Sequence, residues 1–192
     1  MKKKVTAILL SAAVALGLLS GCGKKNNGVD ESWTKIQEKK EFVLGLDASF
    51  PPMGFTDDNG EIVGFDIDLA REACKRLGIE LKLQPINWDA KEQELNTGKI
   101  DAIWNGFTIN EQRKKQVLFT KPYMKNRQVI IVKGDSDIET LKDLAGKKLA
   151  LQSASSAAEA LDKNQELKDS IKGKAPIEFK DNMTALMDLD KG

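Results

Sequence analysis

Segments with strand character alternate with segments with helix character along this chain of 192 residues, and this alternation restricts the fold more than any other feature. Apolar or alternating patterns predict strands at 41–46, 80–83 and 100–104, and helices at 66–77 and 88–97 lie between and beside them. Strands that alternate with helices are typical of a parallel sheet flanked by helices. We therefore predict an α/β fold.

The second half of the sequence starts a new α/β unit. Residues 128–132 form a nearly continuous apolar run, which predicts a buried strand. Further elements are predicted as strands at 148–151 and 177–179, as helices at 138–145 and 182–189, and as short helices at 32–40, 111–117 and from Ser153 onward. We expect residues 33–126 to form one lobe and residues 127–192 a second.

The N-terminus has the organisation of an export signal. Three lysines at positions 2–4 precede an apolar stretch at 5–19, and Leu19-Ser20-Gly21-Cys22 follows at once. The tetrapeptide resembles the lipobox of bacterial lipoproteins, in which the cysteine becomes the lipidated first residue. We expect residues 1–21 to be removed, Cys22 to carry a lipid, and residues 22–32 to form a flexible tether. An ordinary signal peptide with a chance cysteine is the alternative.

Composition restricts the chemistry that the chain can perform. The 30 basic and 29 acidic residues nearly balance, which gives no electrostatic footprint for nucleic acid. The sequence contains no histidine, the commonest general base and metal ligand. Cys74 is the only cysteine besides Cys22, and its pattern favours a buried core position without a disulfide. We predict no metal and no cofactor.

Two stretches concentrate residues that could bind a ligand. After the first strand, Asp47 and Phe50 precede two prolines, which fix φ and remove backbone donors, so we expect a rigid loop without strand pairing. After the third strand, Gly106 lets a ligand approach the backbone, and Arg113 carries a fork suited to a carboxylate. A solvated arginine within a basic run is the alternative for Arg113.

These stretches carry a resemblance to a known family. Residues 42–65 resemble the opening of the solute-binding proteins of polar amino acid ABC transporters, where a strand leads to Asp-x-x-Phe-Pro-Pro and then Asn-Gly-x-x-x-Gly-Phe-Asp-x-Asp-Leu. Residues 101–123 resemble their second signature, Asp-Ala-x-x-x-Gly-x-Thr-Ile-x-x-x-Arg followed by Phe-x-x-Pro-Tyr, and residues 152–157 the third. Three signatures in order, after a lipobox, resemble family 3 of the bacterial extracellular solute-binding proteins and imply a two-lobed type II periplasmic-binding fold.

The resemblance implies a role for each matching residue. Arg113 would clamp the ligand α-carboxylate, assisted by Thr108, the backbone at Gly106, and the hydroxyl groups of Ser155 and Ser156 at a helix N-terminus.

Five other positions would shape the cleft. Asp47 would accept a hydrogen bond from a ligand amino group or polar side chain, Phe50 and Trp88 would pack on the ligand side chain, and Asn105 and Gln152 would help to set specificity. Plainer roles stay open: core packing for the two aromatic residues, helix capping for Ser155 and Ser156, and turn formation for Asp47 and Asn105.

The resemblance also implies an aspartate, one strand beyond the helix at 182–190, that holds the ligand α-amino group, and the sequence stops at Gly192. We expect a second lobe that is incomplete, in a fragment or the product of an interrupted gene, and we expect this product to fold poorly or bind weakly by itself.

We predict a non-catalytic receptor, extracytoplasmic and lipid-anchored to the cell membrane, that captures a polar amino acid between two lobes and delivers it to ABC transporter permease subunits. One alternative is a dehydratase-like enzyme on the same fold, with Asp47 or Asp89 as acid or base. Another is a ligand-sensing module fused to a signalling domain.

Overall fold

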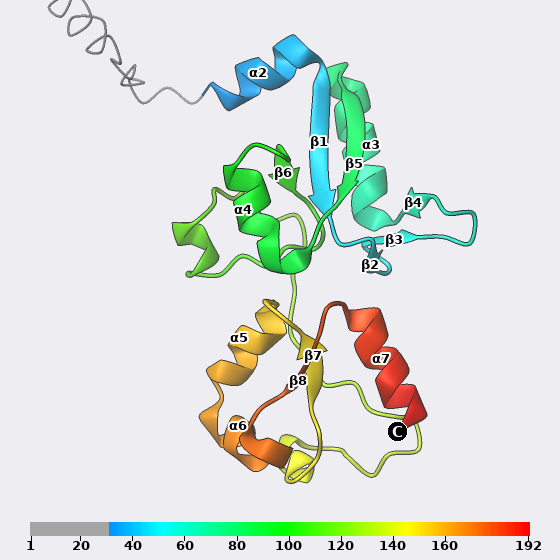
Figure 1. The fold of residues 1–192 in the computed structure, drawn as a ribbon, viewed down its shortest axis with the longest axis vertical. Coiled ribbons are helices and arrows are strands. Elements are labelled where there is room, and N and C mark those ends of the chain that lie inside the picture. Colours follow the sequence, from blue (N-terminus) through cyan, green and yellow to red (C-terminus); the bar gives the residue numbers. More distant parts are fainter. Residues whose placement is uncertain (1–30) are drawn as a thin grey trace, which may run out of the picture. The chain divides into compact units, whose positions relative to one another are not determined.

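The computed structural model describes residues 31–192 (Figure 1). The predicted signal peptide, Cys22 and nearly all of the predicted tether lie outside the described residues. Residues 34–192 form one compact unit. Among the described residues, no helix combines the length and the apolar character needed to cross a membrane.

A parallel sheet with the strand order β5–β1–β6 forms the first half of this unit (Figure 1). Strand β1 (Glu41–Leu46) follows helix α2 (Ser32–Lys39) and pairs with β5 (Glu80–Pro85) and β6 (Ala102–Ile103). Helices α3 (Phe65–Leu77) and α4 (Lys91–Asn96) connect the strands. Four residues at the centre of the core are fully buried: Leu44, Leu46, Ile67 and Ala70. The predicted α/β arrangement is confirmed.

Helix α3 begins and ends where the sequence signals predict. Asp66 and Asp68 lie in its first turn, where negative charge favours the helix dipole, and Lys75 and Arg76 lie in its last turn. Gly78 ends the helix in the left-handed conformation, with φ of 66°. Such a φ is open to glycine at little steric cost.

The loop after β1 differs from the prediction, because it contains strand pairing. Strands β2 (Ser49–Phe50), β3 (Gly54–Thr56) and β4 (Ile62–Val63) form a small antiparallel sheet, in which Phe50 lies opposite Gly54. The expectation of a loop without ladder pairing was therefore wrong. The two prolines occupy the turn between β2 and β3, where missing backbone donors interrupt no pairing.

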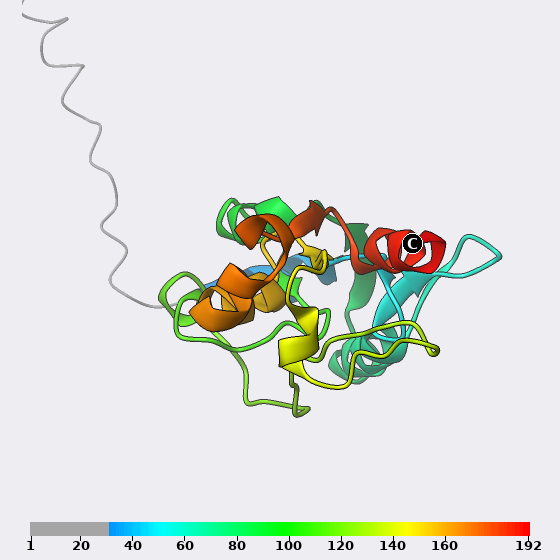
Figure 2. The same cartoon turned by 90° about the horizontal axis from the view of Figure 1, so that it is seen from below.

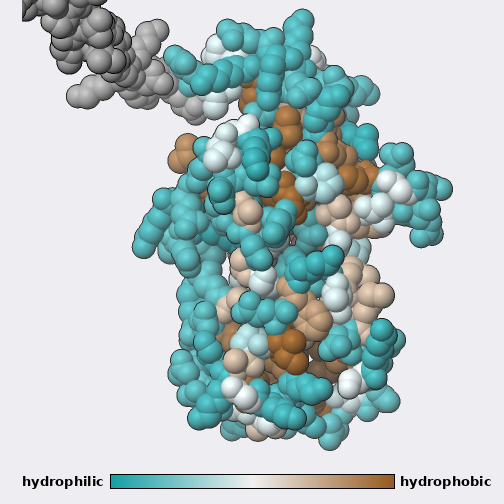
Figure 3. All heavy atoms as spheres, viewed as in Figure 1, coloured by the Kyte–Doolittle hydropathy of each residue, from teal (hydrophilic) through white to brown (hydrophobic). Residues whose placement is uncertain are grey.

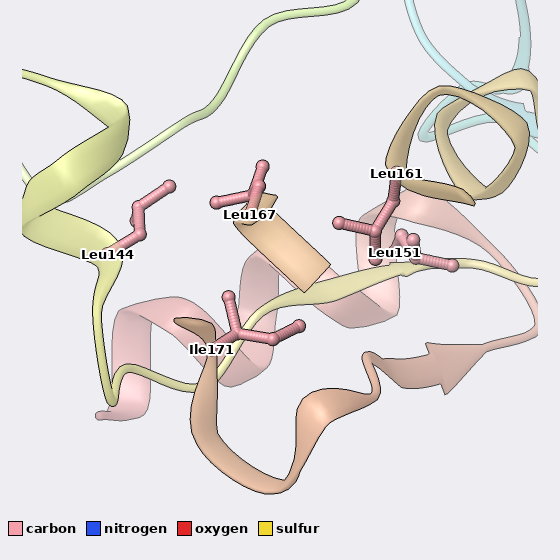
Figure 4. Close-up of a cluster of buried hydrophobic side chains, with 5 residues drawn as sticks. All are labelled: Leu144, Leu151, Leu161, Leu167 and Ile171. Carbon is pink, nitrogen blue, oxygen red and sulfur yellow. The ribbon is translucent and has the colours of Figure 1, made fainter. Parts of the chain in front are cut away.

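The second half contains a two-stranded parallel sheet of β7 (Ala150–Gln152) and β8 (Ile177–Phe179). Around it lie the 3-10 turns η3 (Leu141–Leu144) and η4 (Lys172–Lys174) and helices α5 (Ser156–Asp162), α6 (Gln165–Ser170) and α7 (Asn182–Lys191). Helix α7 lies beside β7 and also contacts β2 (Figure 2). A second core lies in this half, where side chains point toward one another (Figure 4). They come from η3, β7, α5, α6 and the residue after α6: Leu144, Leu151, Leu161, Leu167 and Ile171.

The predicted buried strand at 128–132 is wrong. This segment has no assigned secondary structure, and Val129 and Ile131 are 63% and 59% exposed. A continuous apolar run is buried as a strand only when neighbouring strands cover it, and no described strand pairs with this segment. Apolar atoms also reach the surface around β7 and β8 (Figure 3), where Ile177 is 40% exposed.

Two predicted helices are only single 3-10 turns. Residues 111–117 contain η2 (Arg113–Lys115), and residues 138–145 contain η3. In the first segment only Arg113 and Val117 are buried, so little apolar packing supports a longer helix. The predicted helix at 88–97 is confirmed as the 3-10 turn η1 (Trp88–Ala90) followed by α4.

Candidate ligand-binding site

A cavity of about 1010 Å³ brings most of the predicted site residues together. Nine of them line it: Phe50, Trp88, Asn105, Gly106, Thr108, Arg113, Gln152, Ser155 and Ser156. They come from β2, η1, the loop after β6, η2, the end of β7 and the start of α5. The cavity also extends along the exposed segment 129–133 and helix α7, so its volume is at the upper end of the range for small-molecule sites.

Asp47 is the one predicted site residue that does not line this cavity. Its carboxylate accepts hydrogen bonds from the Ser49 backbone amide and from Gln152 Nε2, both at 2.8 Å. Gln152 Nε2 also donates to the Lys180 carbonyl at 3.0 Å, and its Oε1 accepts from Asn182 Nδ2 at 3.1 Å. Asp47 therefore fixes the orientation of the Gln152 amide beside the cavity.

Arg113 is a buried cation beside the cavity, only 6% exposed. Its Nη1 donates to the Thr108 carbonyl at 3.0 Å and its Nη2 to the Ala154 carbonyl at 3.4 Å, and the guanidinium lies 4.2 Å from the Phe107 ring centroid. Within residues 31–192 no carboxylate forms an ion pair with it. Burial lowers the pKa of Arg113 below its usual value, although arginine stays charged in proteins. The alternative of a solvated arginine is wrong.

The hydroxyl groups near α5 connect with the loop after β6. Ser155 Oγ accepts from the Ala158 amide at 3.3 Å, so Ser155 is the helix cap that the sequence left open as its plainer role. Ser156 Oγ donates to Thr108 Oγ1 at 3.2 Å and accepts from Gln128 Nε2 at 3.0 Å. Ser155 and Ser156 both border the cavity, and their contact with a ligand stays a prediction.

Aromatic rings pack behind the cavity around Phe107, a residue that the sequence analysis did not single out. Phe107 stacks on Phe119 at 5.5 Å and meets the edge of Trp88 at 5.7 Å between ring centroids. Trp88 is buried and therefore serves both the core and the cavity wall. Gly106 adopts φ of 59°, a conformation open to glycine, and a Cβ at this position would lie 3.5 Å from side-chain atoms of both Phe50 and Met53.

Sequence reasoning also missed the role of Asp66, although this residue lies within the first signature. Its carboxylate is fully buried and accepts hydrogen bonds from the Gly106 amide at 2.6 Å and from Tyr123 Oη at 2.8 Å. Burial raises the pKa of Asp66, while the hydrogen bonds from Tyr123 and Gly106 act against this rise. Asp66 thereby connects the loop at Gly106 to the segment at Tyr123. A buried carboxylate partner for the Gly106 amide could not be read from one-dimensional spacing.

The substitution Asp66→Asn is expected to change how stability depends on pH. Because the folded pKa of Asp66 is raised, the folded state binds more protons than the unfolded state from about pH 4 upward to that pKa. The stabilising contribution of the protonated Asp66 side chain is therefore full below about pH 4 and is lost as the pH rises through this window. We expect the difference in free energy of unfolding, wild type minus Asp66→Asn, to fall between pH 4 and 7 in urea titrations.

Asp68→Asn is the matched control, since it removes an exposed carboxylate from the same helix turn. A difference between wild type and Asp66→Asn that stays constant across these pH values contradicts the assignment.

The described residues contain no group of three or more His, Cys, Asp and Glu side chains that could hold a metal ion. What the cavity offers is one buried cation, hydroxyl groups, backbone at a glycine and aromatic surface. Asn105 lines the cavity, but its Oδ1, which has no hydrogen-bond partner within residues 31–192, is buried away from solvent. Such a set can bind a small polar molecule with a carboxylate and donor groups.

A protein family model matches most of this chain, and individual proteins resemble it as well. Residues 42–188 match the family model described as "Bacterial extracellular solute-binding proteins, family 3". Over 185 residues the chain is 30% identical to the L-cystine-binding protein TcyJ of Escherichia coli K12, covering 95% of this chain and 67% of that protein. It is 33% identical over 145 residues to the arginine-binding extracellular protein ArtP of Bacillus subtilis, covering 76% and 54%, respectively.

Solved structures resemble this chain as well. An ABC uptake transporter substrate-binding protein from Streptococcus pneumoniae, with bound histidine, aligns with a TM-score of 0.82 at 41% identity, covering 84% of this chain and 66% of that one. The holo arginine-binding protein of T. maritima aligns with a TM-score of 0.74 at 41% identity, covering 83% and 68%. The chain thus spans about half to two thirds of the length of these proteins.

Proposed function

This chain belongs to the bacterial extracellular solute-binding proteins of family 3, and on that premise we propose that it captures an amino acid for an ABC importer. The likeness to the histidine-bound and arginine-bound structures confirms the expected α/β fold of type II periplasmic binding proteins. Members of this family bind solutes and are not enzymes.

The observation that carries the proposal is the burial of Arg113 beside the cavity. A buried cation is unfavourable unless an anion or strong hydrogen-bond acceptors compensate it. Arg113 has two carbonyl acceptors, one of them at a long 3.4 Å, and no ion pair within the described chain, where the Glu92 and Glu159 carboxylates act on its charge only from beyond ion-pair distance. The α-carboxylate of an amino acid supplies the missing anion in the bidentate geometry that a guanidinium prefers.

The remaining polar groups suit the rest of an amino acid. Asn105 and Gln152 both line the cavity. Gln152 Oε1, whose amide Asp47 orients, can accept a further hydrogen bond from a polar ligand side chain or amino group, because both Nε2 hydrogens already donate within the protein. Phe50 and Trp88 offer apolar surface to the ligand side chain. The printed ligands of the relatives, cystine, arginine and histidine, all combine a carboxylate with polar groups.

The wider setting is part of the same proposal. Residues 33–126 and 127–192 would contribute the two walls that close on the ligand, and closure would create the surface that permease subunits recognise. Export through the signal at 1–21 and lipidation of Cys22 would hold the receptor at the outer face of the membrane. Family membership supports an extracytoplasmic location, and the lipobox resemblance supports the anchor.

Titration calorimetry of the purified chain tests this function. We expect at least one of L-histidine, L-arginine and L-cystine to bind, with the weak affinity that the sequence predicts for this chain by itself. L-histidinamide and L-argininamide, which lack the carboxylate, should bind at least about 100-fold more weakly, because they leave Arg113 without an anion. Absence of binding by all three amino acids, or equal binding of acid and amide, would count against the proposal.

A further inference from the structure

Lys91 is a second buried cation at the site, although it does not line the cavity. It opens α4 and is only 2% exposed. Its Nζ donates to the Trp88 carbonyl at 3.0 Å and to the Ala154 carbonyl at 3.1 Å, and it lies 5.2 Å from the Trp88 ring centroid. The nearest carboxylate oxygen, on the adjacent Glu92, lies 3.4 Å away. The contacts of this ammonium group are therefore mostly with two backbone carbonyls and an aromatic ring.

The Ala154 carbonyl is shared by two cations. It accepts from Lys91 Nζ at 3.1 Å and from Arg113 Nη2 at 3.4 Å. Ala154 itself adopts φ of 48°, which is unfavourable for a residue with a Cβ and persists only where the surroundings hold it. The two donors hold this turn together with Ser153, whose amide donates to the Phe179 carbonyl at 2.8 Å and whose Oγ donates to Asp89 Oδ1 at 2.6 Å.

The Ala154 turn positions one wall of the cavity. Gln152 precedes it, and Ser155 and Ser156 follow it, and all three line the cavity. Trp88, whose carbonyl Lys91 also binds, lines the cavity from η1. Lys91 and Ala154 lie 63 residues apart in sequence. Lys91 therefore connects two walls of the site without occupying it.

Burying an ammonium group is unfavourable, and burial lowers the pKa of Lys91, with the Arg113 charge acting in the same direction and Glu92 against it. A purely structural contact between two loops does not require a charge. A charged donor is useful where a carbonyl must stay hydrogen-bonded after another cation has stopped donating to it.

We propose that Lys91 is a positioning residue for ligand binding that holds the Ala154 carbonyl when a ligand carboxylate draws Arg113 away. This inference rests on the proposed function. The Arg113 contact with Ala154 is the longer of the two, so it is the one that a carboxylate displaces. Lys91 then keeps the Gln152–Ser156 turn against η1, and the two walls stay together around the ligand.

The sharing of the carbonyl can be tested without any ligand. Hydrogen–deuterium exchange of the peptide covering residues 153–160 is compared in wild type, Lys91→Met, Arg113→Ala and the double variant. Since either cation alone can hold Ala154, each single variant should speed exchange by less than about twofold, and the double variant by about tenfold or more, well above the roughly fourfold of additive effects. Additive effects in the double variant would overturn the sharing. Lys99→Met, at an exposed lysine following α4, is the matched control.

Binding measurements test whether Lys91 holds the Ala154 carbonyl when a ligand carboxylate draws Arg113 away. For whichever of L-histidine, L-arginine and L-cystine the wild type binds, we expect Lys91→Met to weaken binding about tenfold, through faster dissociation with little change in association. Lys91→Gln, which keeps a donor without the charge, should fall between Lys91→Met and the wild type, and it replaces Lys91→Met if that variant does not fold. Unchanged dissociation in both variants overturns the proposal. If the wild type binds none of the three, the proposed function fails, and the exchange measurement still decides whether the carbonyl is shared.

Discussion

Replacing Arg113 by alanine should abolish most of the affinity for an amino acid. The guanidinium is the one buried group in the cavity wall that carries a full positive charge, and it forms no ion pair within residues 31–192. Removing one partner of a buried, hydrogen-bonded charge pair weakens binding by about 2–5 kcal/mol, so we expect a loss of about 30-fold or more. Calorimetric titration with the amino acid that the wild type binds measures this loss.

Two further variants separate charge, geometry and folding. Arg113→Lys keeps the charge but lacks the planar fork, so its affinity should recover only in part. Lys114→Ala removes a neighbouring exposed lysine that pairs with Glu111, and it should bind like the wild type. Thermal unfolding shows that each variant is folded. Equal affinity of Arg113→Ala and Lys114→Ala would show that the carboxylate binds elsewhere.

The largest expected effect on stability comes from Gly64→Ala. Gly64 precedes α3 with φ of 133°, a conformation open essentially to glycine alone. A Cβ at this position would lie 2.5 Å from the Met53 carbonyl oxygen and 2.9 Å from the Pro52 carbonyl oxygen. These carbonyls accept from the backbone amides of Asp66 and Phe65, so neither can move without breaking a hydrogen bond. Strain and overpacking together should lower the free energy of unfolding by about 3–5 kcal/mol.

The substitution should also disturb the site, because Pro52 and Met53 line the cavity. Gly60→Ala provides the control, since its φ of 83° is also positive but no atom lies within 4 Å of the added Cβ. It should lower stability by only about 1 kcal/mol. Urea unfolding measures the free energy of unfolding of both variants. Similar losses for the two would show that the close contacts around Gly64 do not cause the destabilisation.

Much of the fold was readable because the signals are local. The helix at α3 follows from apolar spacing, acidic residues in its first turn and Gly78 at its end. Arg113 and Gly106 were identified from their place after a strand, and both line the cavity. Their contact with a ligand stays a prediction, to be settled by the titrations above.

Other features depend on context that no local pattern carries. The apolar run at 128–132 predicted a buried strand, yet burial requires neighbouring strands, and none pairs with it in the described chain. Strands β2, β3 and β4 contain two or three residues each, too few for a period to be detected. They form because pairing with one another satisfies their backbone groups.

The sequence by itself determined the alternation of strands and helices, the turns at glycine and proline, and the kinds of side chain that could hold an amino acid. Only the tertiary structure decided which of those side chains find a hydrogen-bond or ion-pair partner within the protein itself. Asp47 is engaged by Gln152, 105 residues away, and Lys91 by Ala154, 63 residues away, whereas Arg113 remains without an ion pair in the described chain. Burial and pairing arise between segments distant in sequence, and they determine which polar group is left for a ligand.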